Sequence, residues 1–140
     1  VGISETRRAA SLTAQHKEGS SLYLGDGEGV RRRGGIGFII SKDWSAKIAS
    51  CQIRSARVGT LFLQLNKKKT LKVIKAKTPT VESTVEELEE FYDDLEEKPS
   101  NPSSFTVVMG DFNTKLGRSV PDECYTGKHE FKERNERGNR

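Results

Sequence analysis

One stretch near the C-terminal end limits the folds open to this chain more than any other. Five apolar or β-branched residues, 105–109, run directly into the tetrapeptide Gly-Asp-Phe-Asn at 110–113. A loop signal with two prolines and three serines, 98–104, precedes them. The pattern predicts a buried strand, covered on both faces, that delivers polar groups at its C-terminal end. Because chemistry gathers at such strand ends in layered α/β proteins, Asp111 and Asn113 are the first candidate site residues. An ordinary turn, in which Asp and Asn bond their own backbone, explains the same tetrapeptide.

Four further segments predict strands, since each is rich in Ile, Val, Leu or Phe and bounded by polar residues or glycine: 36–41, 46–53, 59–66 and 70–76. Their closeness in the sequence predicts antiparallel pairing within one sheet, with a hairpin turn at 66–69. The preceding residues, 9–33, are polar and glycine-rich, and they predict a surface loop that ends in three consecutive arginines.

A helix is predicted near 84–97. Apolar residues recur there at intervals of four, three, four and three, at Val81, Val85, Leu88, Tyr92 and Leu95. Ser83 and Glu86 have the spacing of a capping box. Dense carboxylates surround the apolar stripe, which predicts an outer-layer helix with one buried face.

Composition limits the chain to a single domain with a lean core, because 33% of its 140 residues are apolar and 31% are charged. The net charge of +4 is compatible with a polyanionic partner, but it is also common in proteins that never touch nucleic acid. Cys51 and Cys124 are too few and too far apart for a disulfide framework or a zinc site. No apolar run approaches the roughly 20 residues that span a bilayer. These features predict an intracellular protein that does not associate with a membrane.

Gly-Asp-Phe-Asn resembles the signature of the endonuclease/exonuclease/phosphatase superfamily, the metal-dependent phosphodiesterases related to DNase I. Other stretches share the resemblance in the family's order, namely 4–8, 33–38, 78–80, 90–95 and 133–138. Within the superfamily, the chain most resembles the endonuclease domain of RTE-type non-LTR retrotransposons and the related craniofacial development protein 2-like sequences. The resemblance implies an α/β (α+β) fold over residues 1–140, a partial DNase I-like two-sheet α/β sandwich that is truncated at both ends. Apolar surface normally buried by the missing half should then be exposed, which predicts marginal solubility.

The resemblance also implies roles for individual residues. Glu5 would hold the catalytic Mg²⁺, for which Mn²⁺ could substitute, whereas without the resemblance it reads as a solvated carboxylate beside two arginines. Asp111 would orient and deprotonate the attacking water, and the Asn113 amide would bond the phosphate oxygens. Lys77 stands where the family has a phosphate-contacting Tyr, and we expect it and Arg33 to bind substrate.

Two segments of the family have no counterpart in this chain. One is an N-terminal strand that bears an Asn, and the other is a C-terminal Ser-Asp-His segment whose His completes the catalytic centre. Neither His16 nor His129 replaces it, because each lacks the preceding Ser-Asp. We therefore expect the 140-residue chain to be inactive by itself.

The expected parent protein is a Mg²⁺-dependent DNA-nicking endonuclease within a retrotransposon polyprotein. Its expected partners are DNA and the reverse transcriptase region of that polyprotein, with no small-molecule cofactor, and it would be nuclear if it acts on chromosomal DNA. Two alternatives stay open. One is a phosphatase of the same superfamily that acts on a phosphomonoester or a phosphoinositide. The other is a degenerate, non-catalytic module for nucleic-acid binding or protein interaction.

Overall fold

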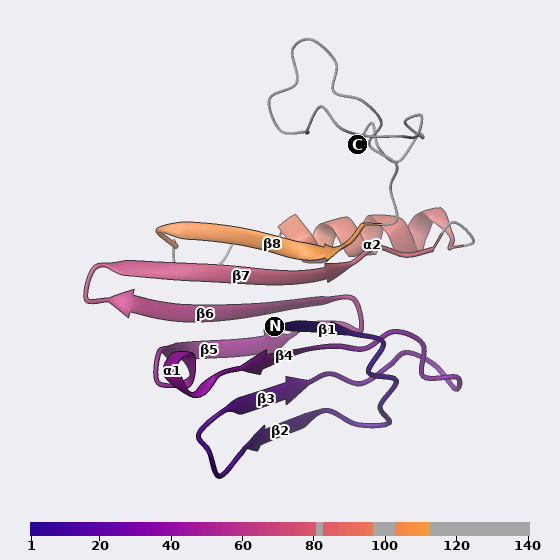
Figure 1. The fold of residues 1–140 in the computed structure, drawn as a ribbon. Helices are drawn as coiled ribbons and strands as arrows, with labels where there is room; N and C mark the ends of the chain where they lie inside the picture. The colour runs from indigo at the N-terminus through magenta and orange to yellow at the C-terminus, as the bar shows by residue number, and fades with distance from the viewer. Residues whose placement is uncertain (81–82, 97–102, 113–140) are drawn as a thin grey trace, which may run out of the picture.

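Two four-stranded sheets and two helices form the described part of the chain, residues 1–80, 83–96 and 103–112 of a computed structural model (Figure 1). The first sheet has the strand order β1-β4-β3-β2, with β1 at Gly2–Ser4, β2 at Leu12–Gln15, β3 at Ser21–Leu24 and β4 at Ile36–Ile40. The second has the order β5-β6-β7-β8, with β5 at Ile48–Ile53, β6 at Val58–Asn66, β7 at Lys69–Lys77 and β8 at Phe105–Asp111. The helices are α1 at Lys42–Ser45 and α2 at Val85–Glu96. This arrangement confirms the expected two-sheet α+β fold.

The main core lies between the two sheets. Phe38 and Ile40 of β4 pack against Leu61 and Leu63 of β6, and all four are at most 5% exposed. Alternate residues of a strand point to opposite faces, so one face of β6 serves this core. Its other face carries Val58, which belongs to a second apolar cluster.

Helix α2 covers the outer face of the second sheet. Phe91, which is 2% exposed, packs against Val58, Ile74 and Ala76. Burying such a side chain contributes about 1.5–3 kcal/mol. The molecule is therefore built in three layers, with a sheet, a second sheet and a helix. No helix among the described residues combines the length and apolar character needed to cross a bilayer.

The expected buried face of α2 is partly wrong. Leu88, Tyr92 and Leu95 do contribute to it, but Val85 is 63% exposed, and Phe91, absent from the predicted stripe, is the most deeply buried residue of the helix. Val81 lies outside the described residues. The predicted capping box is wrong by one residue, because Thr84 Oγ1 accepts the hydrogen bond from the Glu87 backbone N–H at 3.2 Å.

Two expectations about the sheets are also wrong. The predicted strands at 36–41 and 46–53 do not pair with each other, because the turn of α1 between them carries the chain from the first sheet to the second. Residues 9–33 are not all loop, since they contain β2 and β3, which pair antiparallel. Leu12 and Ala14 alternate with exposed residues in β2, a period that glycines and charges nearby obscured. The hairpin at 66–69 is confirmed, because the Asn66 side chain accepts hydrogen bonds from the Lys68 and Lys69 backbone.

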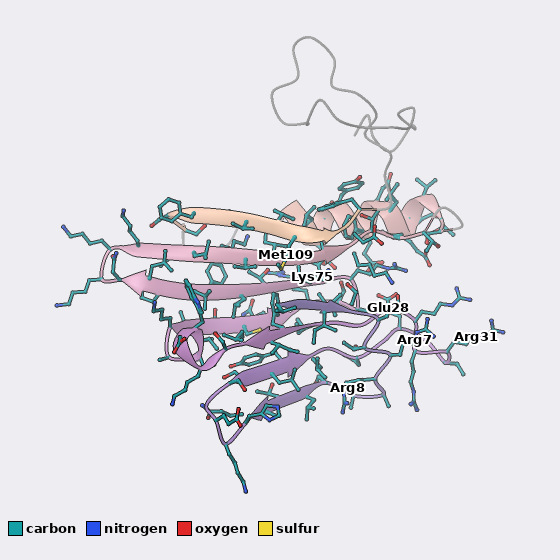
Figure 2. All side chains as sticks on the ribbon, in the orientation of Figure 1. Arg7, Arg8, Glu28, Arg31, Lys75 and Met109 are labelled. Atoms are coloured by element: carbon teal, nitrogen blue, oxygen red, sulfur yellow. The ribbon has the colours of Figure 1, made fainter. Side chains whose placement is uncertain are left out.

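The expectation that β8 is covered on both faces is wrong. It is the last strand of the second sheet, is exposed at every residue, and pairs in parallel with β7 and with no other strand of the described residues. Figure 2 shows Lys75 of β7 and Met109 of β8 side by side, and a Cβ built on Gly2 of β1 would lie 2.8 Å from Lys75 Cδ and 3.0 Å from Met109 Sδ. Val107, two residues before Met109 in β8, is 48% exposed.

Candidate functional site

Three segments far apart in the sequence meet at one end of the sheets. Strand β1 ends at Ser4 and is followed by Glu5, while β7 ends at Lys77. The loop between β3 and β4 lies at the same end, where Figure 2 shows Arg7, Glu28 and Arg31 grouped together. This end of the molecule therefore collects charged side chains from three parts of the chain.

Glu5 is the centre of this group. Its Oε1 forms an ion pair with Lys77 Nζ, and its Oε2 accepts a hydrogen bond from Arg7 Nε at 2.9 Å. The Lys77 side chain is 15% exposed, whereas that of Arg7 is 70% exposed. The ion pair with Lys77 is therefore the better shielded of the two, and water and salt weaken it less.

The backbone around Glu5 adopts conformations that L-residues rarely take. Glu5 has a φ of 59° and Arg7 a φ of 48°. Backbone hydrogen bonds from Thr6 N to Gly35 O at 3.0 Å and from Arg7 N to Gly34 O at 3.1 Å hold this turn in place. Strain of this kind costs on the order of 1–3 kcal/mol for each residue and persists where the surroundings fix it. The turn directs Glu5 toward the end of β7.

A cleft with a volume of about 740 Å³ opens beside this ion pair. Five cationic residues and three carboxylates line it, namely Arg7, Arg31, Arg33, Arg57, Lys77, Glu5, Glu28 and Glu87. The Arg57 side chain is only 19% exposed, and its Nε lies 3.7 Å from Glu28 Oε2. The excess of positive charge favours an anionic ligand.

The segment that leads into α2, together with Glu87 of the helix's first turn, forms another part of the cleft wall. Thr80, Ser83, Thr84 and Glu87 all line it. The amino-terminal end of a helix carries partial positive charge from its backbone N–H groups, which adds to the attraction for an anion. The Glu87 carboxylate, in the first turn of α2, opposes this attraction.

The structure brings together three of the residues predicted from the sequence. Glu5, Lys77 and Arg33 all line the cleft. Asp111 pairs with Lys77 across β7 and β8, and its backbone oxygen accepts a hydrogen bond from Thr78 N at 3.0 Å. Asp111 is nonetheless not among the described residues that line the cleft. Three of the five predicted site residues therefore line one cleft.

Two of the predicted or considered residues, Asn113 and His129, lie outside the described residues. His16 lies in the turn between β2 and β3, away from the cleft. Sequence reasoning missed Arg57 and Glu28. Both stand in polar connecting segments without a periodic pattern, so no signal in the sequence marked them.

The expected Mg²⁺ does not fit the described residues as they are arranged. Mg²⁺ requires oxygen ligands at about 2.0–2.1 Å in near-octahedral geometry. Both carboxylate oxygens of Glu5 are already engaged by Lys77 and Arg7. Within residues 1–80, 83–96 and 103–112, no three His, Cys, Asp or Glu side chains gather into a group that could hold a metal ion. A divalent cation at Glu5 would have to displace two side-chain cations.

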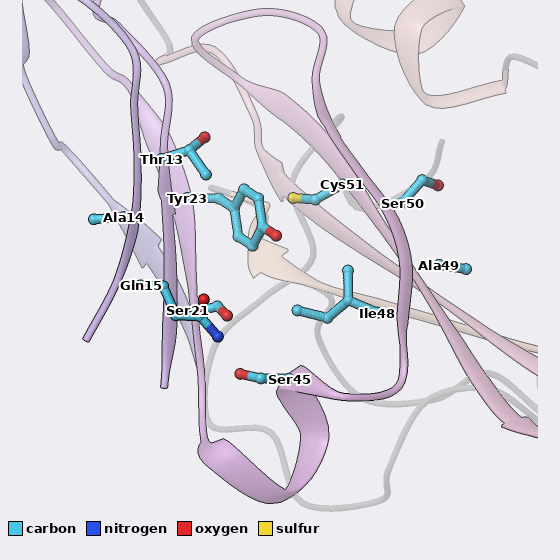
Figure 3. Close-up of a pocket in the computed structure, with 10 residues that line it drawn as sticks. All are labelled: Thr13, Ala14, Gln15, Ser21, Tyr23, Ser45, Ile48, Ala49, Ser50 and Cys51. Carbon is cyan, nitrogen blue, oxygen red and sulfur yellow. The ribbon is translucent and has the colours of Figure 1, made fainter. Parts of the chain in front are cut away.

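A second pocket of about 400 Å³ lies near the other end of the sheets (Figure 3). Tyr23 of β3 and Ile48 and Cys51 of β5 point into it. Burial raises the pKa of the Cys51 thiol from its ordinary value of 9.0 to about 11. The thiol is therefore protonated at neutral pH and a poor nucleophile, and this pocket offers no chemistry comparable to that of the cationic cleft.

Comparisons of the chain with protein-family models, with curated proteins and with solved structures find no match.

Proposed function

We propose that this chain is the DNA-binding part of a phosphodiesterase domain of the DNase I-like superfamily, of the kind found in retrotransposon endonucleases. The observation that carries the proposal is the convergence of Glu5, Lys77 and Arg33 on one cleft. These residues stand at three separate places in the sequence, and each falls in or beside a different segment that resembles the superfamily. Their meeting at strand ends supports a common role.

The chemistry of the cleft supports a phosphate ligand. Guanidinium groups donate paired hydrogen bonds to phosphate oxygens, and Arg33 and Arg57 both line the cleft. A volume of about 740 Å³ accommodates a nucleotide-sized group. In this proposal Arg33, which is exposed, makes the outer contact with the DNA backbone, and Arg57 makes the inner one.

The parent protein would then also carry a reverse transcriptase region and would act in the nucleus on chromosomal DNA. Those statements rest on the resemblance of the sequence to retrotransposon endonucleases. The cleft by itself supports the binding of a phosphate and does not distinguish DNA from a phosphomonoester. Competition of a soluble inositol phosphate against DNA separates these two ligands.

The proposal is tested by the dependence of DNA binding on salt. Arg33→Ala should weaken binding of a labelled DNA duplex and reduce the slope of log affinity against log salt by about 1, because one phosphate contact is lost. Fluorescence anisotropy over a range of salt concentrations measures both quantities. Lys17→Ala is the matched control, since Lys17 is exposed in the turn between β2 and β3 at the far end of those strands. Equal effects of the two substitutions would contradict a specific role for the cleft.

A second candidate function is a non-catalytic nucleic-acid-binding module. One observation favours it, namely that both oxygens of Glu5 are engaged by side-chain cations. In this interpretation the cleft keeps its phosphate-binding arginines and performs no hydrolysis.

We expect the 140-residue chain to leave supercoiled plasmid intact in the presence of Mg²⁺. The physical reason is that Glu5 is paired with Lys77 and Arg7 and is not free to bind the metal. Agarose-gel separation of supercoiled and nicked plasmid measures the outcome. Nicking that requires Mg²⁺ and disappears in Asp111→Ala would show instead that the chain is an active endonuclease.

A further inference from the structure

We propose that the Lys77 ammonium occupies the place of a metal ion beside Glu5. The cleft then binds phosphate groups with the protein's own positive charges and needs no divalent metal. This inference rests on the proposed function, because it concerns the same cleft and names the cation that serves it. It departs from the role that the resemblance implies for Glu5. In this structure Glu5 is the counter-charge of a lysine, and not a metal ligand.

The position of Lys77 makes it a fixed part of the site. Its backbone N–H donates to Arg57 O at 2.9 Å, and its Cα pairs with that of Asp111 in β8. Backbone contacts with Arg57 on one side of β7 and with β8 on the other therefore fix the position of Lys77. Its largely buried side chain reaches Glu5 from the end of β7. A lysine so placed sets its ammonium group beside the carboxylate.

The charges that remain define what the cleft attracts. Lys77 and Arg7 together more than neutralise Glu5, and Glu28 faces Arg57. Arg31 and Arg33 add two further positive charges to the lining, and Glu87 adds one negative charge, so the positive charges still outnumber the negative ones. A divalent cation would enter a cleft that already has a cationic excess, which Coulomb repulsion disfavours, whereas a phosphate would be attracted.

This arrangement predicts opposite effects for the two partners of the ion pair. If Glu5 held a metal, Glu5→Gln would abolish metal-dependent binding. If Glu5 instead holds Lys77, Glu5→Gln removes a negative charge near the phosphate and leaves binding unchanged or tighter. Lys77→Ala removes one positive charge and leaves the Glu5 carboxylate to be neutralised by Arg7 alone, so the cleft attracts the phosphate less strongly.

The experiment measures the affinity of the 140-residue chain for a labelled DNA duplex, in EDTA and in Mg²⁺. We expect equal affinity in both conditions for the unmodified chain and for Glu5→Gln. Lys77→Ala should lower the affinity by about tenfold, the order of magnitude of one lost charged contact. Adding Glu5→Gln to Lys77→Ala should restore most of it. Lys17→Ala again serves as the control for the loss of one positive charge.

Binding that requires Mg²⁺, or that Glu5→Gln abolishes in a folded protein, would overturn the inference and leave the proposed function intact. Circular dichroism establishes whether each variant is folded, and the unmodified chain in EDTA decides the metal question without any variant. If the chain binds no DNA in either condition, the proposed function fails. The inference about Lys77 is then decided by electron paramagnetic resonance of added Mn²⁺: equal binding by the unmodified chain and Glu5→Gln supports it, and a site that Glu5→Gln removes overturns it.

Discussion

At the scale of single residues, the cleft depends on backbone positions that tolerate no side chain. Gly35 has a φ of +82°, and a Cβ built on it would lie 2.1 Å from Thr6 Oγ1 and 3.2 Å from Arg7 N. The Thr6 hydroxyl cannot move away without losing its hydrogen bond to Gly25 O at 2.8 Å. Gly35 is therefore required by both its conformation and its surroundings. It supports the turn that presents Glu5.

Gly35→Ala should destabilise the protein more than Gly29→Ala. Gly29 has a φ of +66°, and a Cβ added there would meet no atom within 4 Å, so its substitution measures the conformational cost alone, about 1 kcal/mol. Gly35→Ala adds the overlap with Thr6 and should cost about 2 kcal/mol more. Urea unfolding of the two variants measures the difference. Equal losses of unfolding free energy would show that the turn adapts to a side chain.

At the scale of elements, α2 shows how a helix start is fixed by one hydroxyl. Thr84 Oγ1 accepts the hydrogen bond from Glu87 N, and Thr84 O accepts one from Leu88 N at 3.3 Å. The pKa of the Glu86 carboxyl lies below its ordinary value because its own backbone N–H, and then the Thr84 side chain, donate to the carboxylate. A lowered pKa means that this contribution is present above the unfolded-state pKa near 4.5 and is lost as the pH falls through the lower folded-state pKa. The neutral Thr84 hydroxyl and the ionised Glu86 carboxylate therefore both act at the start of α2.

Thr84→Ala should lower the unfolding free energy by about 1 kcal/mol, since the Glu87 N–H loses its acceptor at the end of the helix. Ser83→Ala, one residue earlier, should change it by no more than a few tenths of a kcal/mol, because the cap is Thr84. Thermal unfolding followed by circular dichroism compares the two variants. A larger effect of Ser83→Ala would restore the cap position expected from the sequence.

At the scale of the whole molecule, β8 lies at one edge of the second sheet, and within the part of the chain that the structure describes no further strand pairs with it. Phe105, Val107 and Val108 are each 45–50% exposed. Exposed apolar edge strands favour association with other chains. This observation agrees with the marginal solubility expected from the sequence, which stays a prediction.

The sequence by itself determined where most of the strands and the main helix lie. Strands β4 to β8 and α2 were located to within about two residues, because apolar runs and their periods are local properties. The resemblance to the superfamily also singled out Glu5 and Lys77 as site residues. β2 and β3 were missed because four-residue strands in polar surroundings leave a weak period.

The tertiary structure alone decided which faces meet. The pairing of β4 with β1 and β3, the packing of Phe38 on Leu61, and the exposure of β8 depend on contacts between distant segments, which a local period does not encode. The same holds for the cleft. The end of β7 lies beside the strained turn that follows β1, so Lys77 meets the carboxylate that the family resemblance assigned to a metal.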